Sequence, residues 1–238
     1  MTTTTPQQRP VALVTGASRG LGRALAIALA GRGWRLVIDA RSRSELEAVS
    51  SLAPGSVPVV GDVTSPMHRE ALVAAVEELG GLDLLVNNAS DLGPSPLPNL
   101  GEFPLDALRR IYETNVVAPL ALTQLLLPKL TASAGTIVNV SSDAAVEAYE
   151  GWGGYGSSKA ALDQLGRVLA AENQPVRVYG FDPGDMRTDM HQRAFPGEDI
   201  SDRPEPETVV PALLRLLDER PVSGRYQASD LAAPAGAS

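Results

Sequence analysis

Residues 11–22 read Val11-Ala-Leu-Val-Thr-Gly-Ala-Ser-Arg-Gly-Leu-Gly22, a short apolar run that passes directly into a glycine-rich turn. The run is apolar on both faces, as a buried parallel strand is, and a helical pattern follows it. Glycines let the backbone approach a pyrophosphate, and a helix N-terminus offers free N–H groups and positive dipole. The spacing Gly-x-x-x-Gly-x-Gly differs from the commoner Gly-x-Gly-x-x-Gly. By itself it leaves open a glycine-rich turn that binds nothing.

Short apolar runs and longer helical patterns alternate along the rest of the chain. We expect strands at residues 11–15, 35–38, 57–60, 82–86, 135–140, 177–181 and 225–228. We expect helices at residues 22–31, 44–52, 67–80, 105–130, 155–172 and 206–218. This alternation predicts an α/β fold, a single doubly wound Rossmann-type domain built from right-handed crossovers. Its mostly parallel sheet of about seven strands is flanked by helices on both faces.

The composition excludes several classes of protein. Of the 238 residues, 44% are hydrophobic and 20% charged, which is ordinary globular composition. The net charge of −8 argues against nucleic acid or an anionic membrane as the main partner. The sequence contains no apolar run of about 18 residues, so we expect no membrane-spanning segment. We expect one domain at residues 8–231, with flexible tails at 1–7 and 232–238.

Cysteine and histidine usage limits the possible sites. Cysteine is absent, so the sequence has no disulfide or thiolate site, and a reducing cytoplasm is the expected location. The first ten residues are polar and do not read as a signal peptide. His68 and His191 are the only histidines, so we expect no metal site. His68 begins a polar helix, whereas His191 lies in a loop where it could touch a substrate.

Further motifs follow the strand ends in a fixed order. They are Asp62-Val63, Asn87-Asn88-Ala89, Asn115 within Thr-Asn-Val, Ser142, Tyr155-x-x-x-Lys159, and Pro183-Gly184 followed by Thr188. With the turn at residues 16–22, they resemble the short-chain dehydrogenases/reductases, in their single-domain subtype, over roughly residues 10–190. Ser90 departs from the pattern, because the family's Asn-Asn-Ala is followed by glycine. The resemblance implies hydride transfer between a nicotinamide dinucleotide and a ketone, an aldehyde or a secondary alcohol.

The resemblance also implies which residues bind the cofactor. They are Gly16, Ser18, Arg19, Gly20, Leu21, Gly22, Arg41, Asp62, Val63, Asn88, Ala89, Tyr155, Lys159, Pro183, Gly184 and Thr188. In the family, the aspartate of the Asp-Val pair holds the adenine. Thr188 is expected at the nicotinamide carboxamide, and Asn87 is expected to brace the sheet turn beneath the cofactor.

The end of the second predicted strand bears on the choice between NAD and NADP. In the family, the acid that selects NAD lies seven residues after a glycine that matches Gly33, and this position is Ala40. Asp39 lies one residue earlier, where its side chain should point elsewhere. Arg41 and Arg19 could clamp the 2′-phosphate of NADP. NADP(H) is therefore favoured over NAD(H), although a one-residue bulge would bring Asp39 to the ribose and leave Arg41 a surface charge.

Tyr155 and Lys159 are four residues apart, so a helix places them on one face. A free phenol has a pKa near 10, and a neighbouring ammonium favours the phenolate. We therefore expect Lys159 to lower the pKa of Tyr155, which then exchanges a proton with the substrate oxygen. Ser142 is expected to hydrogen-bond that oxygen, because its step of 13 residues to Tyr155 resembles the family's. Ser141 is then structural.

Asn115 lies inside the long apolar pattern at residues 105–130. A polar residue there is usually on a solvated face or at a local kink. The resemblance instead implies a role in catalysis, in which the asparagine holds a water that links Lys159 to bulk solvent.

Two segments are expected to wall the substrate, residues 143–154 and the lid-like 189–205. Tyr149 and Trp152 would form apolar walls, with Asp143 beside them. The acidic residues of this region are Asp143, Glu147, Glu150, Asp185 and Asp189. They favour neutral or cationic carbonyl compounds, or else serve only solubility.

The C-terminal part departs from the family. Many relatives have Thr-Gly-Gln and then Asp-Gly-Gly, whereas this chain has Ser223-Gly-Arg-Tyr-Gln227 and no Asp-Gly-Gly. A tetramer is therefore in doubt, but apolar residues such as Leu125 lie beyond one helical stripe and favour at least a homodimer. Two other functions stay open. One is redox-neutral epimerisation or dehydration on the same fold, and the other is a non-enzymatic nucleotide-binding regulator.

Overall fold

In the computed structural model of this protein, which describes residues 9–231, seven strands form one parallel sheet. They are β1 Val11–Val14, β2 Arg35–Ala40, β3 Ser56–Val60, β4 Leu84–Asn87, β5 Thr136–Val140, β6 Arg177–Asp182 and β7 Gly224–Gln227. Their order is β3-β2-β1-β4-β5-β6-β7, so the direction of winding reverses between β1 and β4. The predicted fold, a single doubly wound α/β domain, is confirmed.

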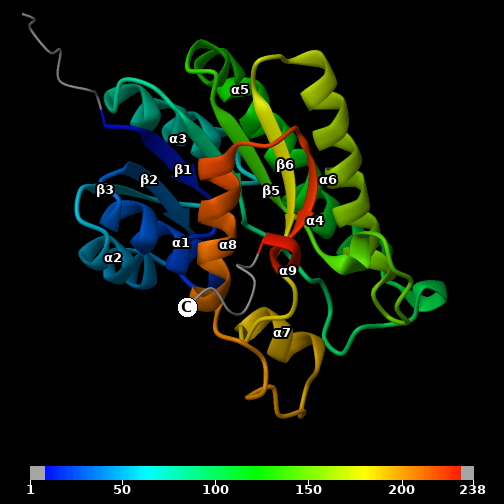
Figure 1. The fold of residues 1–238 in the computed structure, drawn as a ribbon. Coiled ribbons are helices and arrows are strands. Elements are labelled where there is room, and N and C mark those ends of the chain that lie inside the picture. Colours follow the sequence, from blue (N-terminus) through cyan, green and yellow to red (C-terminus); the bar gives the residue numbers. More distant parts are fainter. Residues whose placement is uncertain (1–8, 232–238) are drawn as a thin grey trace, which may run out of the picture.

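Helices cover both faces of the sheet (Figure 1). On one face lie α1 Gly20–Gly31, α2 Arg43–Leu52 and α8 Pro206–Glu219, and on the other lie α3 Pro66–Glu78, α5 Ala118–Ala132 and α6 Gly153–Glu172. Two separate apolar cores hold these layers. Leu25, Leu46 and Leu213 lie in the first core, and Leu72 and Leu126 in the second. Both cores exclude water from the strands, which explains why the strand sequences are apolar on both faces.

One crossover has the opposite hand to the others. The steps from β5 to β6 and from β6 to β7 go in the same direction along the sheet. The first passes through α6 on one face, and the second through α8 on the other face, where α8 packs against α1. The prediction of right-handed crossovers throughout is therefore wrong for this last step. The chain reaches α8 through α7 Asp189–Ala194, a short helix in a segment predicted as a loop.

The helix predicted at residues 105–130 is divided. It consists of α4 Leu105–Tyr112, a π-helical turn at Glu113–Val117, and α5. The π turn contains Asn115, whose side chain is fully buried. A π turn interrupts the regular backbone hydrogen bonds and turns side chains that follow it. Of the two structural readings that the sequence allowed for Asn115, a local irregularity is found and a solvated face is not.

The described chain ends with α9 Ala228–Leu231, which begins directly after β7, whereas the sequence predicts a strand to residue 228. The predicted tails at 1–7 and 232–238 lie outside the described residues. Within residues 9–231, no helix has both the length and the apolar character needed to cross a membrane.

Leu13 tests the second core, because its side chain on β1 is completely buried. We expect Leu13→Ala to lower the free energy of unfolding by about 2–5 kcal/mol through lost burial and a residual cavity. Leu105→Ala is the control, since Leu105 is 64% exposed. Urea titrations followed by circular dichroism measure both. An equal loss in the two variants would contradict the assigned core.

Candidate active site

The turn between β1 and α1 is fixed by hydrogen bonds from the end of β4. The Asn88 side chain donates to the carbonyl oxygens of Thr15 (2.8 Å) and Gly16 (3.0 Å). The Thr15 hydroxyl accepts from the amides of Asn88 and Ala89, both at 3.0 Å. Gly16 has φ +65°, and a Cβ there would lie 2.8 Å from the Ala89 Cα. Position 16 therefore requires glycine, both because of its positive φ and because the backbone of Ala89, just after β4, lies so close.

Asp39 is turned into the protein, between the glycine-rich turn and α3. Its side chain is buried, with Oδ1 accepting a 2.7 Å hydrogen bond from the Gly16 amide and Oδ2 lying 2.9 Å from His68 Nε2. Burial raises the pKa of Asp39, against the opposing effects of His68 and the Gly16 amide. The register of β2 with β3 is regular through Ala40, so no bulge turns Asp39 outward. The sequence-based direction of this side chain is confirmed.

Positive groups lie around the same turn. Arg41 is exposed at the end of β2 and has no ion-pair partner within the described part of the chain. Arg19 is the N-cap residue of α1, but its side chain makes no capping hydrogen bond to the helix. Instead it forms a 2.8 Å ion pair with Asp189, the first residue of α7. The α1 N-terminus and Arg41 thus present the donors and the positive charge that a dinucleotide's phosphates need.

Two more predicted cofactor residues, Asp62 and Val63, follow β3. At the end of β3, Asp62 Oδ1 accepts hydrogen bonds from the Thr64 amide (2.9 Å) and hydroxyl (2.8 Å). Partial burial raises the pKa of Asp62, but these hydrogen bonds and the charge of Arg41 outweigh it and lower the pKa. Val63 beside it is buried. Asp62 and Arg41 are therefore close enough for their charges to interact, as an adenosine site would require.

The turn after β6 closes over the glycine-rich turn. Gly184 has φ +71°, and a Cβ there would meet nothing within 4 Å, so its backbone is open on one side. A Cβ on Gly20 would lie 3.5 Å from the Thr188 side chain. The Thr188 hydroxyl accepts a hydrogen bond from the His191 amide and so caps α7. The predicted residues Gly20 and Thr188 thus lie close together, and Gly184 lies in the same loop, four residues before Thr188.

Tyr155 and Lys159 are both buried on α6, as their spacing predicts. The Lys159 ammonium donates a 2.7 Å hydrogen bond to the Val140 carbonyl and lies 5.5 Å from the centre of the Tyr155 ring. Burial lowers the pKa of Lys159 to about 8, although the charge of Asp163 works to raise it. Lys159 therefore remains mostly protonated at neutral pH.

The pKa of Tyr155 is raised, which is the opposite of the sequence-based expectation. Burial is the main cause, and the charges of Asp182 and Asp143 add to it, whereas a hydrogen bond with the Ser90 side chain lowers this pKa. The Lys159 ammonium is directed at the Val140 carbonyl and does not offset the burial. The protein's own groups thus keep the phenol protonated at neutral pH, ready to act as an acid.

Ser142 lies at the end of β5 and caps the short turn Asp143–Ala145. Its hydroxyl accepts from the Ala144 amide (3.2 Å) and donates to Asp143 Oδ1 (3.0 Å). Ala144 packs against Tyr155 in one apolar cluster, so the serine turn lies beside the phenol. Ser141 faces the other way, and its hydroxyl donates a 2.8 Å hydrogen bond to Asp163. The expected structural role of Ser141 agrees with this contact.

Asn115 is joined to α6 through the Ser158 hydroxyl. Its side-chain amide donates to Ser158 Oγ (2.9 Å), and Ser158 donates to the Tyr155 carbonyl (2.6 Å). Its side-chain oxygen accepts from Ser90 Oγ at 3.2 Å, and Asp91 binds the same side chain through its backbone. Ser90 therefore contacts both Asn115 and the Tyr155 hydroxyl. In the sequence, Ser90 is notable only because it replaces the family's glycine. No local pattern could show its contacts with Asn115 and Tyr155, which are far away along the chain.

The substrate side is more apolar than the sequence indicated. Trp152 packs edge-on against Tyr155 at 5.7 Å and lies 6.0 Å from the Phe195 ring. The cluster around these rings adds Leu92, Leu97, Ala144, Met190 and Ala194. Sequence reasoning missed Phe195 and Met190, because the lid segment read as polar. Residues at the start of α6, in the turn Asp143–Ala145 and in and after α7 thus pack around the Tyr155 ring.

Tyr149 and the two histidines, which the sequence analysis also considered, lie in different places. Tyr149 is 46% exposed, and its hydroxyl donates a 3.0 Å hydrogen bond to Asp143 Oδ2. It is therefore at the rim, tied to a carboxylate. His191 is buried against Phe195, with ring centres 4.9 Å apart. His68 lies in the first turn of α3, at the helix start where the sequence places it, but it is buried there, with Nε2 2.9 Å from Asp39 Oδ2.

Comparisons with known proteins agree with this arrangement. The family model described as short chain dehydrogenase matches residues 10–199. The chain belongs to this family. It is 37% identical to sepiapterin reductase of Mus musculus over 201 residues, which cover 77% of each protein. It is 32% identical to benzil reductase ((S)-benzoin forming) of Bacillus subtilis over 186 residues, 75% of each.

Solved structures of the family have the same fold. An alcohol dehydrogenase from the archaeon Thermococcus sibiricus, complexed with 5-hydroxy-NADP, superimposes with a TM-score of 0.82 at 27% identity. The match covers 92% of this short chain dehydrogenase and 95% of that chain. Sequence and structure together therefore establish the family and its doubly wound α/β fold.

Gly22 tests the glycine-rich turn. A Cβ at this position would lie 2.4 Å from Asn88 Nδ2 and 2.6 Å from the Gly16 carbonyl oxygen. We expect Gly22→Ala to displace the turn and weaken NADPH binding at least about tenfold. The control is Gly31→Ala in the same helix, where a Cβ meets nothing within 4 Å. NADPH fluorescence titration measures both, and equal affinities would contradict this role.

Proposed function

We propose that this protein is an NADP(H)-dependent reductase that converts a ketone or aldehyde to an alcohol, or runs in reverse on a secondary alcohol. The observation that carries the proposal is the buried Tyr155–Lys159 pair beside Ser142, walled by apolar rings. A buried, protonated phenol at the end of the sheet is suited to give a proton to a carbonyl oxygen. Relatives named as reductases support the same reaction class.

The proposed step divides between three side chains. Tyr155 donates its phenol proton to the carbonyl oxygen, and Ser142 donates a hydrogen bond to the same oxygen after its hydroxyl turns from Asp143. Lys159 stays charged and holds α6 against β5 through Val140. When bound, the dinucleotide supplies the hydride, and the positive charge of its oxidised ring favours the phenolate that remains.

A second group of contacts supports a relay for the proton. Ser90 can turn its hydroxyl from Asn115 to the Tyr155 oxygen and so stabilise the phenolate, which is why its hydrogen bond lowers the pKa of Tyr155. Asn115 keeps its bond from the Asp91 amide when this happens. The implied link from Lys159 through Asn115 to solvent stays a prediction.

The preference for NADP rests on the direction of Asp39. Because this carboxylate is buried against Gly16 and His68, no acid at the end of β2 is free for the ribose hydroxyls. Arg41 is exposed directly after Ala40, the last residue of β2, and Arg19 lies in the adjoining turn. The structure with 5-hydroxy-NADP shows that a relative with this fold accepts an NADP-type ligand.

The same site could also serve redox-neutral chemistry. An epimerase or dehydratase would retain the phenol and the ammonium, so only the products separate the two functions. A regulator that only binds nucleotide needs neither group, and the retention of both argues against it. Incubation with NADPH and a panel of neutral ketones and aldehydes, with absorbance at 340 nm and chromatography of products, distinguishes the three.

Tyr155→Phe tests the proposed acid. We expect its turnover number to fall about 10²–10⁴-fold, because the proton donor is lost while the ring and its packing are kept. The affinity for NADPH should change less than about threefold. Tyr226→Phe is the matched control, since the Tyr226 hydroxyl binds only the Val222 carbonyl at the sheet edge. Full turnover by Tyr155→Phe would overturn the proposed chemistry.

Arg41→Ala tests the cofactor preference. Loss of one guanidinium–phosphate contact should raise the Kd for NADPH about 10–100-fold and leave the Kd for NADH nearly unchanged. Arg43→Ala is the control, because Arg43 is exposed and lies 3.5 Å from Glu47 on its own helix. Tighter binding of NADH than of NADPH by the unchanged protein would contradict NADP as the cofactor.

The assembly stays a prediction. Leu125 on α5 and Val168 on α6 are 45% and 42% exposed, which supports the expected homodimer without deciding for a tetramer.

A further inference from the structure

Arg225 on β7 lies at the centre of a buried group of charges. Its Nη2 donates to Asp182 Oδ2 (2.8 Å) and to the Ser142 carbonyl oxygen (3.0 Å), and its Nε lies 3.3 Å from Asp163 Oδ2. The side chain of Arg225 is 16% exposed, and those of Asp163 and Asp182 are 5% and 4% exposed. One guanidinium therefore faces two carboxylates and a backbone carbonyl in a region with little water.

Each of the three partners belongs to a different part of the active site. Ser142 ends β5 and provides the proposed contact to the substrate oxygen. Asp182 ends β6, and its Oδ1 accepts a 3.0 Å hydrogen bond from the Gly184 amide in the turn over the cofactor site. Asp163 lies on α6, one helical turn after Lys159. The guanidinium of Arg225 thus links β5, β6 and α6 from β7.

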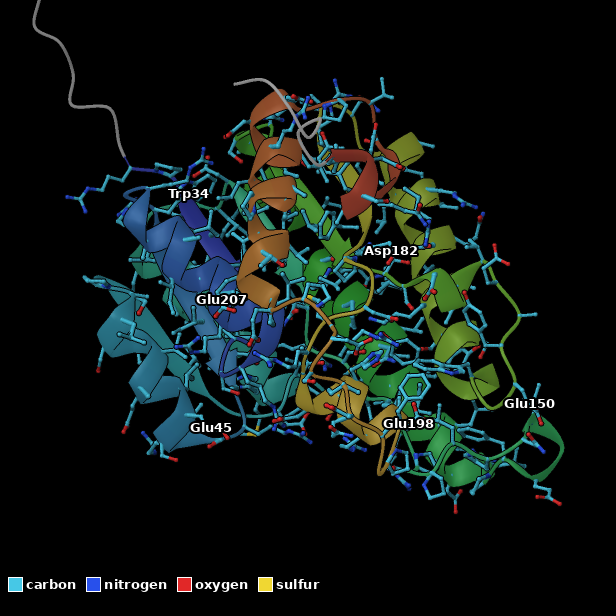
Figure 2. The ribbon with its side chains drawn as sticks, turned by 60° about the horizontal axis from the view of Figure 1, so that its bottom comes forward. Trp34, Glu45, Glu150, Asp182, Glu198 and Glu207 are labelled. Atoms are coloured by element: carbon cyan, nitrogen blue, oxygen red, sulfur yellow. The ribbon has the colours of Figure 1, made fainter. Side chains whose placement is uncertain are left out.

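Figure 2 labels one member of this group, Asp182. Asp182 lies well inside the outline of the molecule, whereas Glu45 and Glu150 lie at its rim. The Gln227 side chain, also on β7, lies 3.3 Å from Asp182 Oδ2. The edge strand therefore contacts the inner end of the site through two of its side chains.

The two carboxylates act on the catalytic pair. The charge of Asp182 raises the pKa of Tyr155, and so does that of Asp143 on the other side. The charge of Asp163 raises the pKa of Lys159. Burial raises the pKa of Asp163 itself, while Ser141, Arg225, Lys159 and Arg167 lower it. Arg225 is the cation that contacts both Asp163 and Asp182, so it offsets the negative charge beside both catalytic groups.

We propose that Arg225 is a positioning residue of the active site, which fixes Ser142 and the turn after Asp182 against α6 and neutralises the two adjacent carboxylates. The proposal rests on the proposed reductase function. A planar guanidinium donates in several directions at once, whereas an ammonium is a point charge on a flexible stem. Charge and geometry can therefore be separated by substitution.

The test compares Arg225→Gln and Arg225→Lys with Arg32→Gln. Arg32 is the matched control because it contacts Asp218 through two hydrogen bonds (3.0 and 2.7 Å), but on the exposed surface between α1 and α8. The readout is kcat for carbonyl reduction with NADPH as a function of pH. Reduction needs the protonated phenol, so activity falls as pH rises through the operative pKa of Tyr155.

Arg225→Gln leaves both carboxylates without their cation, which raises that pKa. We expect the high-pH fall in activity to move up by about 0.5–1 pH unit and kcat to drop about tenfold. Arg225→Lys should keep the wild-type pH profile but not the wild-type kcat. Adding Asp182→Asn to Arg225→Gln removes one of the unneutralised carboxylates, so it should move the pH profile of kcat back toward that of the wild type. A purely structural role would lower activity equally at all pH values, and an unmoved profile in Arg225→Gln overturns the proposal.

A second readout does not depend on turnover. Without Arg225, the ionised form of Asp163 is disfavoured further, and this penalty is relieved as the pH falls and the carboxyl takes up a proton. The melting temperature of Arg225→Gln should therefore lie further below wild type at pH 7.5 than at pH 5, and that of Arg32→Gln should not. If the unchanged protein reduces no carbonyl compound, the proposed function fails. The melting temperatures at the two pH values then decide by themselves whether Arg225 neutralises the carboxylates. An equal loss at both pH values then overturns it.

Discussion

The 2.7 Å hydrogen bond from the Lys159 ammonium to the Val140 carbonyl joins the catalytic helix to the centre of the sheet. An ammonium taken out of water is costly unless it is paired, so this contact and the nearby carboxylates determine whether α6 can keep its place. The same contact directs the charge away from the phenol oxygen, and burial then controls the protonation of Tyr155. The Lys159 ammonium thus contributes both to the packing of α6 on β5 and to the surroundings of the Tyr155 ring.

The sequence predicts the framework well, because local patterns determine it. The apolar runs at β1, β2 and β5 mark the strands, and the Tyr155–Lys159 spacing places both groups on one helical face. Counting from Gly33 is enough to predict that Asp39 turns inward. These features depend on residue order within one or two elements, which is the range that periodicity reports.

The rest depends on contacts between distant parts of the chain. Ser90 meets Tyr155 only after β4 and α6 are brought together, and Arg225 reaches Asp182 across 43 positions. The π turn at Glu113–Val117 interrupts a pattern that looks continuous in the sequence. The sequence-based expectation that the pKa of Tyr155 is lowered fails for the same reason, because the burial that raises this pKa exists only in the packed molecule.

The opposite hand of the last crossover also explains why the site has a cover. After β6 the chain must reach α8, which packs beside α1 on the other face, before it returns to form β7. The connection crosses from one face to the other beyond the carboxyl end of β6, through α7. Residues of this connection meet the segment that follows β4, where the Arg193 side chain donates to the Gly93 carbonyl, and Phe195 packs against Trp152 at the start of α6. Selection is then free to vary this connection for substrate choice while the path of the chain stays fixed.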